Sequence, residues 1–131
     1  MDPVEQVARQ AARKRLARSG ENEAAEELTR RGYAIVARNY HCRGGEADLV
    51  ADDGDALVFA EVKTRSRLDH GLPREAVGWT KQQRLGRAAE HYCAAHGIED
   101  RPIRFDVVEV IVLRDQVVAV EVIRNAFIPE M

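Results

Sequence analysis

Cysteines and long apolar runs are scarce in this chain of 131 residues. The two cysteines, Cys42 and Cys93, form neither a CxxC motif nor a disulfide framework, so we expect two free thiols. A histidine near each cysteine leaves a Cys/His zinc site as the weaker alternative, because the spacing matches no common zinc pattern. No apolar run approaches the ~20 residues that span a bilayer, so we expect no membrane association. The first residues also lack the apolar block of a secretory signal, which favours the cytoplasm.

A dominant charge of one sign is missing as well. The net charge of −2 argues against a strongly basic protein that coats nucleic acid. The charges are nevertheless unevenly distributed, because residues 1–20 and 64–87 are rich in Arg and Lys, whereas residues 46–61 hold six carboxylates. Basic flanks around an acidic centre suit a site that holds both a divalent cation and a polyanion. A mixed, solvated surface is the alternative interpretation.

The length and the ordinary composition, 45% hydrophobic and 32% charged, indicate one globular domain without repeats or linkers. Helical apolar spacing predicts a helix over residues 3–18, which Ser19-Gly20 should end. A second helix is expected over residues 21–31, followed by the C-terminal glycine Gly32.

Strand patterns follow these helices. Residues 33–39, 46–51 and 57–64 predict three strands in an antiparallel meander, because strong turn signals separate them. A long helix is expected over residues 73–96, with Pro73 near its start, and two further strands over residues 103–113 and 116–123. This order predicts an α/β fold: a mixed sheet of about five strands flanked by helices.

Charged residues interrupt two of these strands. Glu61 and Lys63 share one face of their strand, because side chains alternate. If the preceding strand pairs with it through the 52–55 turn, Asp48 lies near Glu61. Two converging carboxylates repel each other unless a cation joins them. Hard oxygen ligands favour Mg²⁺ or Mn²⁺ over zinc, and the backbone carbonyl of Val62 is a further candidate ligand.

This set of residues predicts phosphodiester chemistry. A carboxylate-bound Mg²⁺ can polarise a phosphodiester, orient a water molecule and stabilise the leaving oxygen. Lys63 would then hold the attacking water and offset the charge that grows on phosphorus. The alternative is an ordinary ion pair at the end of an edge strand, which a motif as short as Glu-x-Lys does not exclude.

Periodicity places two more charged residues near the expected core. Lys81 falls on the inward stripe of the long helix and either extends to solvent or reaches the site. Glu21 is either a helix N-terminal carboxylate favoured by the dipole or a third acidic member of the site. Both alternatives stay open from the residues alone.

Other candidates carry weaker signals. Arg65 and Arg67 follow Lys63 and could meet phosphates, although exposed arginines are common. Trp79 could stack on a base, but partly buried packing is the preferred interpretation. Asp106 lies in an apolar strand and is expected to form a structural ion pair or hydrogen bond, for example with an arginine.

Several short motifs occur in a fixed order along the chain: Gly20-Glu21, Arg38-Asn39, Gly45-Glu46-Ala47-Asp48-Leu49, Phe59-Ala60-Glu61-Val62-Lys63-Thr64-Arg65, Lys81 and Arg104-Phe105-Asp106. Taken together, they resemble the motifs of the bacterial YraN family, which is described as related to Holliday-junction resolvases within the PD-(D/E)xK nuclease superfamily. The resemblance covers roughly residues 20–127 and leaves an N-terminal helical extension, residues 1–19, outside a single nuclease-like domain at 20–131.

The resemblance implies a restriction-endonuclease-like α/β core and a role for each matched residue. Asp48 would be the metal-binding acid, Glu61 the second acid and Lys63 the catalytic lysine. Glu21 matches a glutamate that archaeal-type resolvases carry on the first core helix. One departure is Ala47 before Asp48, where the superfamily motif often has proline.

Three functions are therefore compatible with the sequence. The first is a metal-dependent endonuclease acting on branched or otherwise structured DNA. The second is a nucleic-acid-binding or partner-binding module that keeps the fold without turnover. The third is an adaptor domain whose charges form a buried ion-pair network. Symmetric cleavage of a four-way junction would require two active sites and hence a homodimer.

Overall fold

A computed structural model describes residues 2–67 and 77–129 of the chain. Two helices and five strands follow one another in the order α1 (Pro3–Arg30), β1 (Ala34–Cys42), β2 (Gly45–Asp52), β3 (Leu57–Ser66), α2 (Trp79–His96), β4 (Ile103–Leu113) and β5 (Gln116–Ile123). Cys42 and Cys93 are free thiols, as their spacing predicts. Neither helix is long and apolar enough, within the described residues, to cross a membrane.

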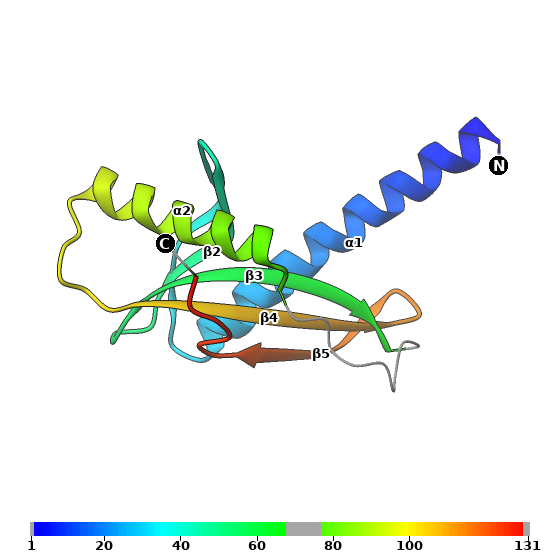
Figure 1. The fold of residues 1–131 in the computed structure, drawn as a ribbon. Coiled ribbons are helices and arrows are strands. Elements are labelled where there is room, and N and C mark those ends of the chain that lie inside the picture. Colours follow the sequence, from blue (N-terminus) through cyan, green and yellow to red (C-terminus); the bar gives the residue numbers. More distant parts are fainter. Residues whose placement is uncertain (1, 68–76, 130–131) are drawn as a thin grey trace.

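The five strands form one mixed sheet in the order β1-β2-β3-β4-β5. All neighbouring pairs are antiparallel except β3 and β4, which are parallel. A parallel pair requires a crossover, and α2 lies on this connection. The helices cover opposite faces of the sheet (Figure 1). The predicted α/β class, the antiparallel meander and the mixed five-stranded sheet are therefore confirmed.

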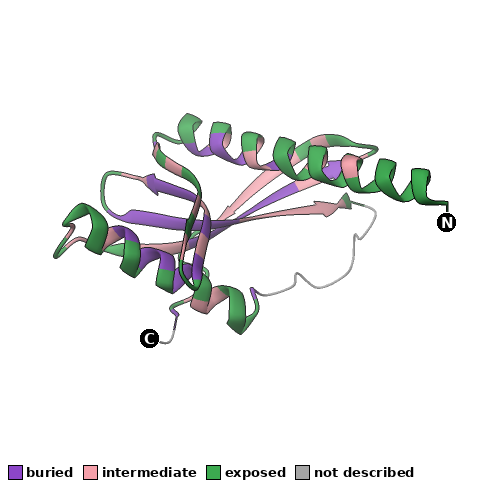
Figure 2. Ribbon diagram, turned by 90° about the horizontal axis from the view of Figure 1, so that it is seen from above, coloured by how far each residue is buried: buried purple, intermediate pink, exposed green. Residues whose placement is uncertain are grey.

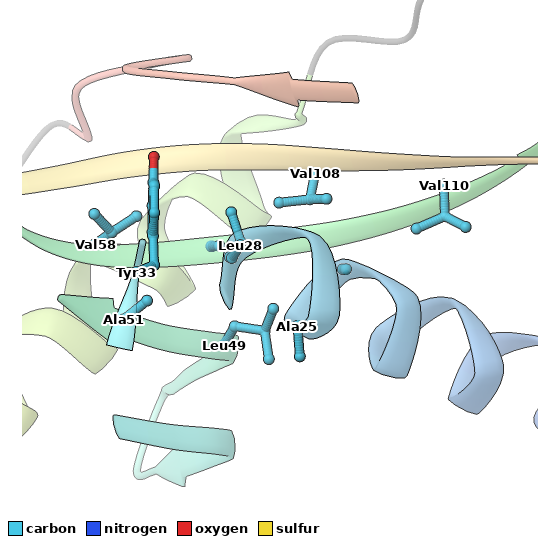
Figure 3. Close-up of a cluster of buried hydrophobic side chains, with 10 residues drawn as sticks. Ala25, Leu28, Tyr33, Leu49, Ala51, Val58, Val108 and Val110 are labelled. Carbon is cyan, nitrogen blue, oxygen red and sulfur yellow. The ribbon is translucent and has the colours of Figure 1, made fainter. Parts of the chain in front are cut away.

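Alternation along the strands divides the core into two layers. Val58 packs on the face covered by α1, together with Leu28 and Val108 (Figure 3). The next residue, Phe59, packs on the opposite face against Leu85 of α2. All five side chains are at most 1% exposed, and burying each contributes roughly 1.5–3 kcal/mol. The central strand β3 is therefore fixed between both helices.

The predicted helix break at Ser19-Gly20 is wrong, because α1 runs continuously from Pro3 to Arg30. Gly20 is buried, and a Cβ added there would clash with the Thr64 side chain of β3. This glycine therefore allows a close approach of helix and strand, and it does not end the helix. The helix ends just before Gly32, as expected, where φ is +92°.

The predicted start of the second long helix is also too early. Pro73 lies outside the described residues, and Val77 is not helical. Gly78 has extended backbone angles and is the N-cap of α2, so the helix begins at Trp79. Its end agrees with the prediction, because Gly97 adopts the left-handed conformation after His96.

The two halves of α1 differ in their surroundings. The C-terminal half contributes Ala24, Ala25 and Leu28 to the core. The N-terminal half extends beyond the sheet and is largely exposed (Figure 2). The proposed division between an extension at residues 1–19 and a domain from residue 20 stays a prediction.

Candidate functional site

The site begins where β2 and β3 separate. Their ladder ends at the pair Leu49 and Ala60, so Asp48 and Glu61 come directly after the last paired residues. The backbone N–H of Val62 donates instead to Asp48 Oδ2 at 2.8 Å. The carboxylate thus takes the place of a ladder acceptor and is held at a fixed position between the strands.

Glu61 lies on the α2 side of the sheet and is 6% exposed. Lys81 of α2 donates from Nζ to Glu61 Oε1 at 2.6 Å. The lysine side chain remains about half exposed, so one end of this ion pair faces solvent. Of the two alternatives for Lys81, this contact favours the one in which the side chain reaches the site. The hydrogen bond to Glu61 also raises the pKa of Lys81, which keeps the ammonium charged.

The electrostatics around Asp48 are unfavourable to its charged form. Burial raises its pKa most, and the charges of Glu61 and Glu21 raise it further, to about 6. The N–H of Val62 and the charge of Lys81 act in the opposite direction but do not offset the increase. Carboxylates from α1 and β3 therefore both disfavour the ionised form of Asp48 on β2. An added cation would favour the ionised form of Asp48.

Glu21 owes its position to the neighbouring glycine. Because Gly20 lets α1 approach β3, the next residue is brought close enough to affect Asp48. The alternative of a helix N-terminal carboxylate is wrong, since α1 begins eighteen residues earlier, at Pro3. The inward position predicted by periodicity agrees with this arrangement.

Lys63 lies on the central strand of the sheet, so the edge-strand location in the ion-pair alternative is wrong. Alternation along β3 puts Lys63 on the same face as Glu61. Its Cα partner across the parallel ladder is Glu109 of β4. Lys63 is partly buried and takes part in contacts of its own.

The remaining candidates occupy different environments. Arg65 is mostly buried and lies 3.9 Å, Nη1 to Oε1, from the buried carboxylate of Glu109. Arg67 follows β3 and is exposed. Trp79 is 66% exposed at the start of α2, so the preferred packing role is wrong. The sequence placed Trp79 inside a helix expected from residue 73, whereas it is the first residue of α2.

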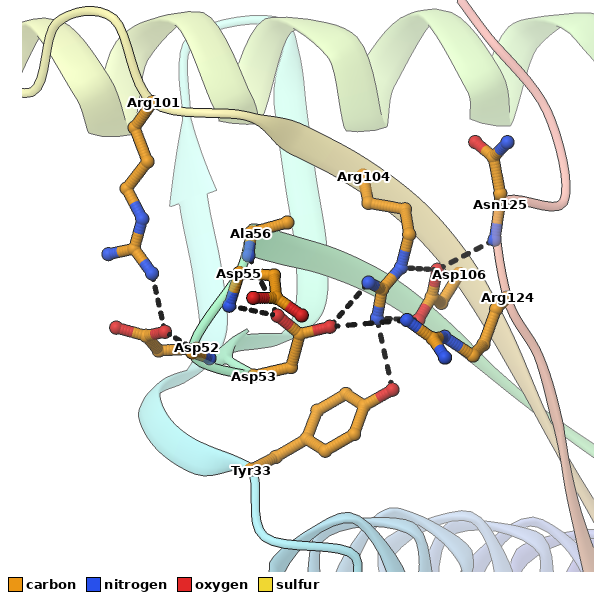
Figure 4. A network of polar contacts seen from close by, with 11 residues as sticks. Tyr33, Asp52, Asp53, Asp55, Ala56, Arg101, Arg104, Asp106, Arg124 and Asn125 are labelled. Carbon is orange, nitrogen blue, oxygen red and sulfur yellow. Dashed lines mark hydrogen bonds and ion pairs between the residues drawn. The ribbon is translucent and has the colours of Figure 1, made fainter.

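A second charged cluster lies on the α1 side of the sheet (Figure 4). Arg104 donates to both carboxylate oxygens of Asp106, at 2.9 and 3.0 Å, to Tyr33 Oη at 3.0 Å, and to Asp53. The backbone N–H of Asn125 also donates to Asp106, at 2.9 Å. The expected structural role of Asp106 is therefore confirmed. The sequence did not predict that Asp53 is a partner of Arg104, because the residues around Asp53 carried only a turn signal.

The side chains around Asp48 and Glu61 determine which metal could fit between them. No group of three or more His, Cys, Asp or Glu side chains that could hold a metal occurs within residues 2–67 and 77–129. A closed structural zinc site needs four protein ligands, so Asp48 and Glu61 do not provide one. Mg²⁺ fits better, because it keeps several waters and often binds through one or two carboxylates and a substrate phosphate. Asp48 and Glu61 supply two carboxylates, and the backbone carbonyl of Val62 would be a further oxygen donor.

Comparisons with known proteins agree with one another. A model of the family described as "Uncharacterised protein family UPF0102" matches residues 20–110. A UPF0102 protein of Symbiobacterium thermophilum is 51% identical over 114 residues, covering 87% of this chain and 97% of the relative. A UPF0102 protein of Moorella thermoacetica is 47% identical over 116 residues, covering 88% and 97%. A third, of Parafrankia sp., is 48% identical over 113 residues, covering 86% and 96%. These names state a family and no activity.

Proposed function

The chain belongs to the UPF0102 family, and we propose that it is a divalent-metal-dependent endonuclease that hydrolyses phosphodiester bonds in DNA, with branched or structured DNA as its substrate. The observation that carries the proposal is the carboxylate of Asp48, which the N–H of Val62 holds beside Glu61. Placing two carboxylates together costs free energy in the absence of a cation. Such an arrangement is typical of a site that binds one.

Each residue has a role in this proposal. Asp48, Glu61 and the carbonyl of Val62 would hold Mg²⁺ or Mn²⁺, which when bound would polarise the phosphodiester and lower the pKa of an attacking water. Lys63 offsets the charge that develops on phosphorus and holds the attacking water. Glu21 is a third carboxylate that adds to the negative potential around Asp48.

The proposed contacts to DNA come from the basic residues around this centre. The ammonium of Lys81 is half exposed and can contact a phosphate without leaving the site. Arg67 is exposed at the end of β3, whereas Arg65 would have to weaken its contact with Glu109. A DNA substrate agrees with a cytoplasmic location. Symmetric cleavage of a junction would also require a homodimer, because each chain supplies one centre.

A second candidate function is a DNA-binding or adaptor protein that keeps the nuclease fold without turnover. The observation that favours it is the ion pair between Lys81 and Glu61, which occupies one carboxylate oxygen at 2.6 Å. A lysine in this position partly replaces the cation that catalysis requires. DNA binding that needs no divalent metal and is unaffected by Glu61→Gln would support this candidate.

Cleavage of labelled four-way, flap, nicked and linear DNA in Mg²⁺ or Mn²⁺ tests the proposal. Asp48→Asn keeps an acceptor for the N–H of Val62 but removes the charge, so we expect cleavage to fall by at least about 10²-fold while the fold persists. Asp55→Asn is the matched control, because Asp55 is an exposed carboxylate on the β2–β3 turn. A folded, metal-loaded protein that cuts none of these DNAs would reject the proposal.

A further inference from the structure

The N-terminal half of α1 carries a concentrated positive charge. Residues 3–19, which we call the basic arm, form the part of the helix that extends beyond the sheet (Figure 1). With Asp2 included, the segment has five basic and two acidic side chains, a net charge of +3. Subtracting this from the total of −2 leaves −5 for the rest of the chain. The basic side chains are Arg9, Arg13, Lys14, Arg15 and Arg18.

These five side chains are exposed to solvent. Within the described part of the chain, none of them takes part in an ion pair or a side-chain hydrogen bond. Elsewhere on α1, by contrast, Arg30 pairs with Glu26 and Glu27 one turn away. A helix that keeps five uncompensated cations on its surface attracts a polyanion.

Helical periodicity divides the arm into two flanks. Lys14 and Arg18 fall on one stripe with Glu21, at spacings of four and three residues. Asn22, four residues after Arg18 and therefore beside it on the helix, accepts a hydrogen bond from Arg38 of β1 at 2.5 Å. This flank therefore continues the side of α1 that faces β1, and its stripe includes the glutamate that affects Asp48.

The opposite flank continues a different side of the helix. Arg9 and Arg13 fall on one stripe with Gly20 and Ala24. Gly20 lies against Thr64 of β3 and close to the β4 side chain Val110. The arm thus carries two pairs of cations of equal charge, of which one pair lies on the stripe that leads to the candidate centre.

We propose that the basic arm lies along the phosphate backbone of a duplex segment of the DNA and contacts it mainly through Lys14 and Arg18. The inference rests on the proposed function, because it takes the DNA to be held at the Asp48 centre. Seventeen helical residues span ~25 Å, which corresponds to roughly seven base pairs beyond the centre. The arm would thereby supply the positive potential that the negatively charged remainder of the protein lacks.

Two other occupants fit this surface less well. A second copy of the chain would place two segments of charge +3 against each other. A membrane surface would require a broader apolar face, whereas Val4 and Val7 are accompanied mainly by alanines. The density of cations and the small size of the apolar residues therefore favour DNA.

The test compares two double variants of equal charge, Lys14→Gln/Arg18→Gln and Arg9→Gln/Arg13→Gln. Glutamine keeps helix propensity, and circular dichroism checks that each variant is folded. Binding to a four-way DNA with arms of about twelve base pairs, longer than the reach of the arm, is followed by fluorescence anisotropy in EDTA, so that no cleavage occurs. The titrations are repeated over a range of NaCl concentrations.

We expect Lys14→Gln/Arg18→Gln to bind DNA on the order of tenfold more weakly. The slope of log K against log[NaCl] should become less steep by about 1.8, because two phosphate contacts are removed. The matched variant should lose less than about threefold. Shortening the duplex arms below roughly seven base pairs should reduce the difference between the variants. Equal losses, or no loss in either, would overturn the inference.

The outcome is distinguishable from failure of the proposed function. If the protein cuts DNA but both double variants bind DNA equally well, the inference about the basic arm is refuted and the proposed function is not. If the protein never cuts DNA but Lys14→Gln/Arg18→Gln loses more DNA affinity than the matched variant, the arm is a DNA contact and the nuclease proposal is refuted. Binding of the unmodified chain to anionic vesicles, lost equally in both variants, would assign the arm to membranes and overturn the inference.

Discussion

Asp48 and Asp53 lie on the same short stretch of chain, at β2 and just after it, but their environments shift their pKa values in opposite directions. Burial raises the pKa of both carboxyl groups. At Asp53, hydrogen bonds from the N–H of Ala56 and from Arg104 outweigh burial and bring the pKa to about 2. At Asp48, the neighbouring carboxylates Glu61 and Glu21 add to burial and the pKa reaches about 6.

This difference separates a structural cluster from a candidate functional one. The Arg104 cluster contains its own cation, which donates to two carboxylates and a phenol. Its charges are balanced by the fold itself. The Asp48 cluster is balanced only partly, by Lys81, and would gain stability from a bound cation. A carboxyl group whose pKa is raised by burial and by neighbouring charges marks a candidate functional site.

Removal of Asp106 tests the structural cluster and should give the largest effect on stability. The side chain of Asp106 is 1% exposed, and the variant Asp106→Ala leaves Arg104 with a buried, partly uncompensated charge. We expect the free energy of unfolding to fall by about 3–5 kcal/mol. Urea unfolding at neutral pH measures it. A loss below about 1 kcal/mol, in the range of surface ion pairs, would contradict the assignment.

Removal of Asp48 should have the opposite sign. Its pKa is raised from 3.8 to about 6 on folding, so its favourable contribution to stability is present below pH 4 and is lost as pH rises through about 6. At pH 7, above both pKa values, the ionised carboxylate therefore costs the folded state about 3 kcal/mol. Asp48→Asn should become more stable than the unmodified protein as pH rises from 4 to 7. Urea unfolding over this pH range checks it, and a constant difference would argue against the raised pKa.

Neutralising the neighbours of Asp48 should give the smallest effects. Glu61→Gln and Glu21→Gln each remove a charge that disfavours ionisation, so both should lower the pKa of Asp48, with Glu61→Gln lowering it more. NMR titration of the Asp48 carboxyl carbon measures the change. Glu26→Gln, at an exposed carboxylate of the same helix, is the control for Glu21. An unchanged pKa in both test variants would mean that the three carboxylates do not interact.

Much of the fold could be predicted from local patterns in the sequence. Alternation and turn residues identified all five strands, because the residues that determine a hairpin lie within or beside it. The neighbourhood of Asp48 and Glu61 followed from the same hairpin, since a short turn fixes the register of its two strands. An ion pair for Asp106 was likewise expected from its position in an apolar strand.

Features that depend on distant residues could not be predicted. Gly20 has the same local sequence whether it ends a helix or allows close packing, and the contact that decides is with Thr64 on another element. The contact between Lys81 and Glu61 depends on where α2 lies relative to β3. The pairing of Arg104 with Asp53 joins residues far apart in the chain. In each case the sequence indicates a residue's character but not its partner.

The central claim is that Asp48 and Glu61 together bind a hard divalent ion. Calorimetric titration with Mn²⁺ at pH 6, in two buffers of different ionisation enthalpy, tests this claim without reference to cleavage. The account predicts binding with release of about half a proton per ion, because Asp48 is then half protonated, and almost no release at pH 8. Asp48→Asn should abolish the release and weaken binding. Mn²⁺ that binds equally well to Asp48→Asn, or does not bind at all, would contradict it.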